Sequence, residues 1–147
     1  MLIRTHRFGD LDVAEESVIH FPEGLVGLSQ FKRFVLLEDP ESPDLIWLQS
    51  ADEPRFVLAT IRASKLGQMY AVEIQDEDRK TLNLKDPEEA EAFVVLNRVE
   101  GKFYANLRGP VIVNIAEMLG KQIVLTNPAY GVRHPVDAVG QPHLATS

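Results

Sequence analysis

The chain has 147 residues, of which 45% are hydrophobic and 25% charged, with a formal net charge of −7 and no cysteine. This length suits one globular domain. The lack of cysteine excludes disulfides, thiolate metal sites and cysteine catalysis. The first residues lack the apolar run of a signal peptide, and no stretch approaches the ~20 apolar residues that span a bilayer. We therefore expect a cytoplasmic protein that does not contact membranes.

The negative charge is concentrated in the middle of the chain. Residues 38–91 carry fourteen acidic and six basic side chains. Such a surface repels phosphate backbones, so we expect no direct binding of nucleic acid. It would accelerate encounter with a basic protein. Composition alone favours solubility as the explanation, because acidic surfaces are common in cytoplasmic proteins.

Apolar runs separated by proline- and glycine-containing turns predict strands through the first half of the chain. The first two runs flank Gly9-Asp10, a pair that suits a tight hairpin turn. Residues 62–67 are predicted as a turn or a single helical turn. The predicted strands of this half span residues 2–8, 11–13, 18–21, 34–37, 45–50, 55–61 and 70–74.

The acidic middle contains the predicted helices. Asp76-Glu77-Asp78 places negative charge where a helix N-terminus favours it. Asp86-Pro87-Glu88-Glu89 is typical of a helix start, with an N-cap, a proline at the first helical position and a glutamate that reaches back to the cap. Strands are again predicted beyond it, with a turn at Glu100-Gly101 and a break at Gly109-Pro110. They span residues 93–99, 102–107, 111–115 and 122–126.

Many short strands with few helices predict a mainly β fold. We expect a single-domain antiparallel β-barrel-like fold with one or two short helices in the acidic middle segment. The domain is predicted to span residues 1–135. Residues 136–147, rich in small residues, are predicted to form a flexible C-terminal tail.

No pattern in the chain is typical of an enzyme. The four histidines lack the close spacing of metal ligands. The adjacent carboxylates lie in polar stretches, where solvent keeps both members ionised instead of separating an acid from a base. The serines lack the G-x-S-x-G elbow of a nucleophile. We therefore expect a non-enzymatic protein without a metal or another cofactor.

Four strings spread along residues 1–135 resemble, in this order and spacing, the FliW family of flagellar assembly factors. Gly109 departs from the alanine expected before Pro110, and residues 62–70 are more polar than the corresponding loop of the family. The strings are His20-Phe21-Pro22-Glu23-Gly24-Leu25, Trp47-Leu48-Gln49-Ser50, residues 106–114 (NLRGPVIVN), and Tyr130 with Arg133-His134-Pro135.

The resemblance implies a binding protein with two partners. FliW proteins bind flagellin in the cytoplasm and, when free, bind CsrA, a basic RNA-binding dimer that represses flagellin translation. Flagellin's terminal amphipathic helices require an apolar groove. Phe21, Trp47 and Tyr130 have structural alternatives as core or barrel-closing residues. Candidate residues for that groove are Phe21, Trp47, Asn114, Tyr130 and Arg133.

The CsrA contact is hypothesised from charge alone. We expect the protein to be a monomer when free. Two other interpretations stay open: a split barrel that binds a small ligand or flavin, and a barrel that acts only as an assembly subunit and forms homo-oligomers. The hypothesised CsrA-contacting residues are Glu38, Asp39, Glu41, Asp52, Glu53, Asp76, Glu77 and Asp78.

Overall fold

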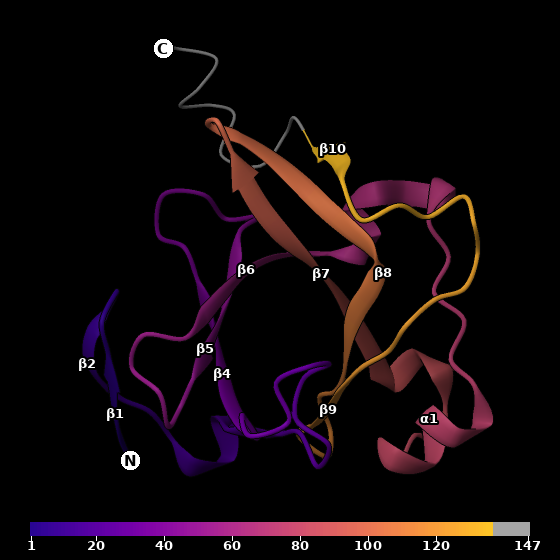
Figure 1. Ribbon diagram of the computed structural model, residues 1–147. Helices are drawn as coiled ribbons and strands as arrows, with labels where there is room; N and C mark the ends of the chain where they lie inside the picture. Colours follow the sequence, from indigo (N-terminus) through magenta and orange to yellow (C-terminus); the bar gives the residue numbers. More distant parts are fainter. Residues whose placement is uncertain (137–147) are drawn as a thin grey trace.

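The computed structural model describes residues 1–136, within which seven strands close into a barrel (Figure 1). Around the barrel the order is β8-β7-β6-β5-β4-β3-β9, and β9 pairs with β8 to complete the ring. Every pairing is antiparallel except that of β3 with β9, which is parallel. This arrangement confirms the predicted mainly β, barrel-like fold. The strands are β3 (Ile19–His20), β4 (Arg33–Glu38), β5 (Ile46–Ser50), β6 (Val57–Arg62), β7 (Ala90–Val99), β8 (Lys102–Asn114) and β9 (Leu119–Gln122).

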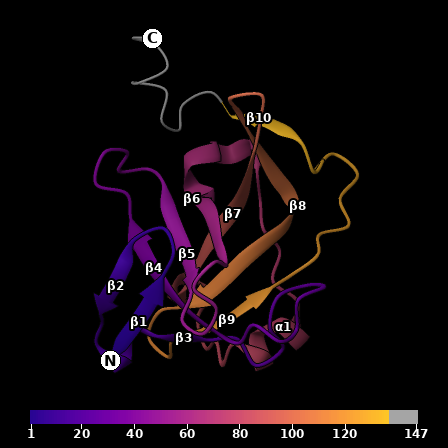
Figure 2. The same ribbon diagram turned by 60° about the vertical axis from the view of Figure 1, so that its left-hand side comes forward.

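Three further strands lie outside the ring. β1 (Leu2–Thr5) and β2 (Gly9–Asp12) form a hairpin, which Figure 2 shows beside β4. Ile3 of this hairpin is buried with Val18 and Val35, so it covers the outer face of β4. β10 (His134–Val136) pairs with the first half of β8.

The barrel interior is filled by apolar side chains from all parts of the ring. They alternate along each strand with residues that face outward, as the two-residue period of a strand requires. Phe21, which follows β3, is fully buried and contacts β9 where Gly120 leaves space for its ring: a Cβ atom at Gly120 would lie 2.4 Å from Phe21 Cζ. The interior side chains include Phe21, Phe34, Ile46, Leu48, Phe93, Val95, Val111 and Val113.

Part of the outer face of β5 to β8 is also buried, so stretches such as residues 94–96 of β7 and 111–113 of β8 are continuously apolar. Residues 63–75 and 123–131 cover it. On β7, Val94 faces this outer cluster while its neighbour Phe93 faces the interior, and both are fully buried. The outer cluster includes Trp47, Ile61, Tyr70, Val94, Leu96, Leu107, Ile112, Ile123, Leu125 and Tyr130.

The predicted turn at Gly9-Asp10 is wrong. Thr5 pairs with Gly9, so the loop consists of residues 6–8 and Gly9 already belongs to β2. The Thr5 hydroxyl donates to the Gly9 carbonyl oxygen (2.7 Å) and accepts from the Phe8 N–H (2.8 Å). A side chain therefore closes this turn, and Gly9 adopts the positive φ of 74° that follows it.

The predicted break at Gly109-Pro110 is also wrong, because β8 continues through these residues with a large, irregular bulge. Phe93 pairs with Val111 and Val95 pairs with Asn106, so residues 107–110 of β8 lie opposite Val94 alone. Proline has no N–H to donate, and a bulge is where a strand tolerates it. The bulge bends β8 instead of ending it.

The acidic middle contains α1 (Asp76–Thr81) and a 3₁₀ segment, Pro87–Glu89, in agreement with the prediction of one or two short helices. The Glu89 carboxylate accepts the N–H groups of Asp86 (2.8 Å) and Lys85 (3.0 Å), which is the reach-back expected from the sequence. Two further 3₁₀ segments span Glu15–Ser17 and Ala63–Met69, the latter matching the predicted helical turn.

Two predicted strands differ in the structure. Residues 70–74 are extended but pair with no strand, and the last barrel strand spans Leu119–Gln122 instead of residues 122–126. Of the predicted C-terminal tail, Val136 ends β10 and residues 137–147 lie outside the described part of the chain.

Replacing Gly120 with alanine should destabilise the protein by about 1–3 kcal/mol, because the new methyl group overlaps the Phe21 ring inside a filled barrel. Gly131→Ala is the matched control. The nearest atom to its Cβ, Arg133 N, would lie 4.0 Å away, so the cost should stay below about 1 kcal/mol. Urea unfolding of both variants tests this, and equal midpoints would show that Phe21 does not limit the space at Gly120.

Candidate functional site

Trp47 lines a surface hollow beside β5 to β8 and is held by two charged neighbours. The indole Nε1 donates to the Asp39 carboxylate (3.0 Å), and the Arg7 guanidinium carbon lies 4.0 Å from the indole ring centroid. Asp39 also accepts the N–H groups of Glu41 and Ser42. Burial raises the pKa of Asp39, but these hydrogen bonds and the charge of Arg7 outweigh it, so the pKa is lowered.

Gln49 and Ser50, the polar residues of the string Trp47-Leu48-Gln49-Ser50, hold the turn between β5 and β6. Gln49 is fully buried, and its side-chain amide donates to the carbonyl oxygens of Ser50 (3.0 Å) and Phe56 (3.2 Å). The Ser50 hydroxyl accepts the N–H groups of Asp52 (3.2 Å) and Glu53 (2.9 Å). Both side chains are therefore committed to the fold.

Phe21 and Asn114, two of the candidate flagellin-contacting residues, are fully buried. Phe21 packs edge-on against Phe34, with ring centroids 5.1 Å apart. The Asn114 side chain donates to the Leu82 carbonyl oxygen (2.8 Å) and accepts the Ala116 N–H (3.1 Å), which ties the end of β8 to the end of α1. Neither side chain offers surface to a partner, and both hold the barrel together.

Tyr130 fastens the covering segments to the barrel. Its hydroxyl accepts the Ala71 N–H (2.7 Å), and its ring packs edge-on against Tyr70 at 4.8 Å. The Tyr70 hydroxyl donates to the carbonyl oxygen of Leu107, within the bulge of β8 (2.7 Å). Burial first, and the neighbouring Tyr130 second, raise the pKa of Tyr70. Arg133 is exposed and makes no ion pair within residues 1–136.

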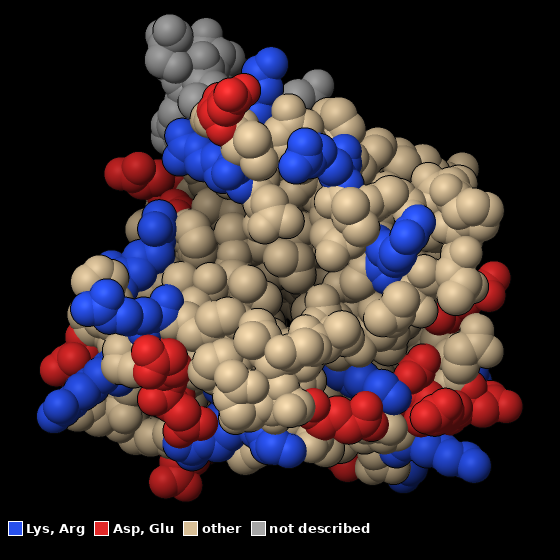
Figure 3. Space-filling view, viewed as in Figure 1, with Lys and Arg blue, Asp and Glu red and all other residues tan. Residues whose placement is uncertain are grey.

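The hypothesised CsrA-contacting carboxylates fall into three separate groups. Glu38, Asp39 and Glu41 lie at one end of the β4–β5 pair, and Asp52 and Glu53 lie beyond its other end, because Glu38 pairs with Ile46 while Phe34 pairs with Ser50. The third group is on α1, across the barrel from β4 in Figure 1. Figure 3 shows the face of the molecule seen in Figure 1, with charged side chains around its rim and mainly uncharged residues at its hollowed centre.

Several of these carboxylates already have partners. Asp52 is hydrogen-bonded to Arg33, which lowers the pKa of Asp52, and Asp78 lies 2.7 Å from Lys121 Nζ. Asp39 is held by Trp47, and Glu53 is only partly exposed. Of the eight hypothesised carboxylates, those that are exposed and make no ion pair among the described residues lie in two places, at the β4–β5 end and at the start of α1. They are Glu38, Glu41, Asp76 and Glu77.

A surface hollow of about 640 Å³, here called the Trp47 groove, opens beside β5 to β8. Its polar rim includes Arg7 and Arg98, and Arg98 lies 5.6 Å from the Phe103 ring centroid. The sequence indicated Trp47 but not its groove neighbours, since strand pairing brings them together from four strands. The apolar lining consists of Leu45, Trp47, Val57, Leu58, Ala59, Leu96 and Phe103.

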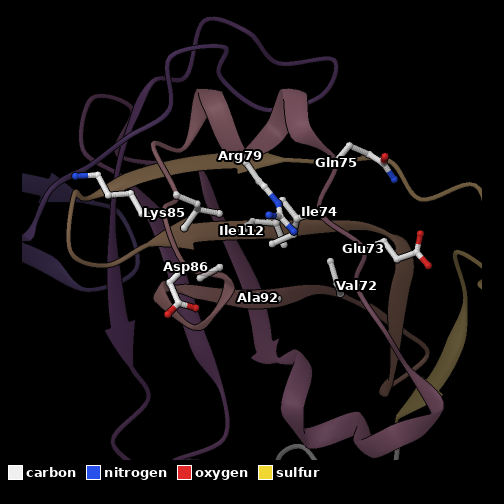
Figure 4. Close-up of a pocket in the computed structure, with 11 residues that line it drawn as sticks. Val72, Glu73, Ile74, Gln75, Arg79, Lys85, Asp86, Ala92 and Ile112 are labelled. Atoms are coloured by element: carbon white, nitrogen blue, oxygen red, sulfur yellow. The ribbon is translucent and has the colours of Figure 1, made fainter.

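A second cavity of about 530 Å³ lies beneath α1. Val72, Ile74 and Ile112 line it, and Figure 4 shows the Arg79 side chain pointing from α1 toward Ile112. Both basic and acidic side chains line the cavity, so its lining favours neither an anionic nor a cationic ligand. Within residues 1–136, no cluster of three metal-binding side chains occurs, and no helix is long and apolar enough to cross a bilayer.

The chain is similar to known proteins in both sequence and structure. The family model described as "FliW protein" matches residues 2–136. A flagellar assembly factor FliW from Geotalea uraniireducens is 34% identical over 137 residues, covering 92% of this chain and 83% of the relative. One from Natranaerobius thermophilus is 34% identical over 139 residues, covering 92% of each chain. A crystal structure of the flagellar assembly factor FliW superposes with a TM-score of 0.84 at 28% identity, covering 92% of this chain and 96% of the other.

Tyr70 should make the stability of the protein depend on pH above about 10, where unfolded tyrosine ionises. Because its folded pKa is raised, its contribution is complete below that pH and declines as pH rises toward the folded pKa. Between pH 8 and pH 11 the wild type should lose about 1.4 kcal/mol relative to Tyr70→Phe. Urea unfolding at both pH values measures this, with Tyr104→Phe as the control that keeps the decline. Parallel pH profiles for wild type and Tyr70→Phe would contradict it.

Proposed function

The chain belongs to the FliW family of flagellar assembly factors, and on this premise we propose that it binds flagellin in the cytoplasm. When free of flagellin, it binds and antagonises the translational repressor CsrA and thereby relieves repression of flagellin synthesis. It acts by binding alone, without catalysis. The observation that carries this proposal is the match of the family model to residues 2–136, supported by an apolar groove and exposed carboxylates on the same barrel.

The Trp47 groove is the surface we propose for flagellin. Its floor of Trp47, Leu96 and Phe103 offers apolar contact to one face of an amphipathic helix. The indole is fixed by Asp39 and Arg7, so binding does not have to order it. Charged groups at the rim fit the polar flanks of such a helix.

The start of α1 is the surface we propose for CsrA. Asp76 and Glu77 are exposed and have no ion pair in the described part of the chain, whereas Asp78 is engaged with Lys121. Free carboxylates attract a basic dimer and repel the RNA that it carries. The groove and α1 are different surfaces, so mutual exclusion of the two partners requires either steric overlap of the bound proteins or a coupling free energy of about 1–3 kcal/mol.

Calorimetric titration with flagellin and with CsrA tests the function. Each should bind, and prior addition of flagellin should abolish the heat of CsrA binding. Val57→Asp, which places a charge in the groove, should weaken flagellin binding at least about tenfold, while Val26→Asp, on an exposed loop residue, should leave it unchanged. Absence of binding to both partners would overturn the proposed function, and equal affinities of the two variants would exclude the groove.

Reversing the charge of Asp76 and Glu77 together should slow association with CsrA about tenfold at low salt and flatten its salt dependence. Glu15→Lys with Glu16→Lys is the matched control, because it reverses two adjacent exposed carboxylates on the 3₁₀ segment before β3. Stopped-flow mixing at several salt concentrations gives both rates. Identical rates for the two double variants would remove α1 from the CsrA surface and leave Glu38 and Glu41 as the alternative.

A further inference from the structure

Two extended segments outside the barrel ladder, residues 71–75 and 123–127, face each other across a narrow cavity, here called the slot. At one end the Ala71 N–H bonds the Tyr130 hydroxyl (2.7 Å), and at the other Asp78 lies 2.7 Å from Lys121 Nζ. The segments therefore run in opposite directions and are joined only at their ends. Between these ties the slot has a volume of about 450 Å³.

The backbone of residues 72–75 has free hydrogen-bonding groups. Among the described residues, none of its four N–H groups donates a hydrogen bond, and the carbonyl groups of residues 72–74 accept none. The side chains alternate as in a strand, with Val72 and Ile74 packed on the outer cluster and Glu73 and Gln75 exposed. Residues 72–75 therefore have the side-chain alternation of a β-strand but pair with no other strand.

The opposite segment has one paired and one free edge. The N–H groups of Ile123 and Leu125 donate to β8 carbonyl oxygens, at 3.0 Å to Pro110 and 2.7 Å to Arg108. Because successive N–H groups of a strand point to opposite sides, those of Val124 and Thr126 point away from β8. Neither makes a hydrogen bond within the described residues, and both residues are exposed.

The slot is wider than the spacing of paired strands. Neighbouring strands lie about 4.8 Å apart, yet here a tyrosine side chain spans the gap at one end and a lysine–aspartate pair spans it at the other. No hydrogen bond joins the two backbones between these ties. An α-helix bonds its backbone groups internally, whereas an extended chain can pair with the free backbone groups on both sides of the slot.

The charges of the slot define the occupant. Its lining contains the carboxylate of Glu73, which makes no ion pair within the described residues, and that of Asp78, whose charge is matched by Lys121 at the end of the slot. The exposed Asp76 and Glu77 adjoin it on α1. We propose that the slot binds an extended, basic segment of a protein partner as an added strand, paired with the free backbone of residues 72–75 and 124–126. The slot adjoins the α1 surface proposed above for CsrA, but the strand pairing proposed here does not require CsrA to be the partner.

The probe is a fluorescein-labelled heptapeptide, Lys-Val-Lys-Val-Lys-Val-Lys, titrated by fluorescence anisotropy. It should bind, and the acidic analogue Glu-Val-Glu-Val-Glu-Val-Glu should not. Amide hydrogen exchange should show new protection at Val72, Ile74, Val124 or Thr126 when the basic peptide is present. Binding of both peptides alike, binding of neither at millimolar concentration, or protection confined to other residues would overturn the proposal.

Two pairs of variants separate backbone pairing from charge. Val124→Pro removes an N–H that makes no internal hydrogen bond, so the fold should persist while peptide affinity falls about fivefold to tenfold; Val124→Thr keeps the N–H and should bind as the wild type does. Glu73→Lys should weaken binding by a similar factor, and Glu16→Lys, with the same charge change elsewhere, should not. Equal affinities within both pairs would overturn the proposal.

Discussion

The bulge of β8 opposite Val94 is the feature on which the rest of the structure depends. It divides one strand into two halves with different partners, since the first half pairs with β10 and the second with β9. Closure of the barrel requires the second pairing. The bulge is held by side chains from distant segments: Tyr70 donates to the Leu107 carbonyl oxygen, and Gln122 donates to that of Gly109 (2.9 Å). Loss of these contacts would weaken the junction between the ring and its outer cover.

The same contacts position the proposed binding surfaces. Tyr70 and Tyr130 pack together and hold residues 63–75 against the outer cluster, from which the chain enters α1. Asn114 fixes the other end of α1 through the Leu82 carbonyl oxygen. Because these hydrogen bonds are buried, each lost partner leaves a polar group without water, which is more costly than the loss of a surface ion pair. The helix that carries these exposed carboxylates is therefore anchored to the barrel by buried hydrogen bonds.

The barrel keeps the proposed apolar binding surface apart from the proposed electrostatic one. The Trp47 groove lies beside β5 to β8, whereas the exposed carboxylates of α1 lie across the barrel. A helix that binds in the groove and a basic protein that approaches α1 contact different elements. β7 and β8 contribute to the groove and, through the outer cluster, support the segment before α1.

The sequence by itself determined the features that depend on neighbours along the chain. Apolar runs indicated the strands, the carboxylates of Asp76-Glu77-Asp78 marked the start of α1, and Glu89 reaches back to Asp86 as its spacing predicts. The four strings also indicated the family that the comparison shows. These features are local because a turn, a cap or a strand period involves only a few consecutive residues.

Only the tertiary structure decided what depends on distant partners. Residues 70–74 have the pattern of a strand but lie beyond any pairing partner, and Gly109-Pro110 continues a strand because Val94 and the covering segments accommodate a bulge there. Burial of Phe21 beside Gly120, dispersal of the acidic residues and assembly of the Trp47 groove follow from barrel closure. Which backbone edges pair and which side chains lose water is set by contacts far apart in sequence, which a local pattern does not contain.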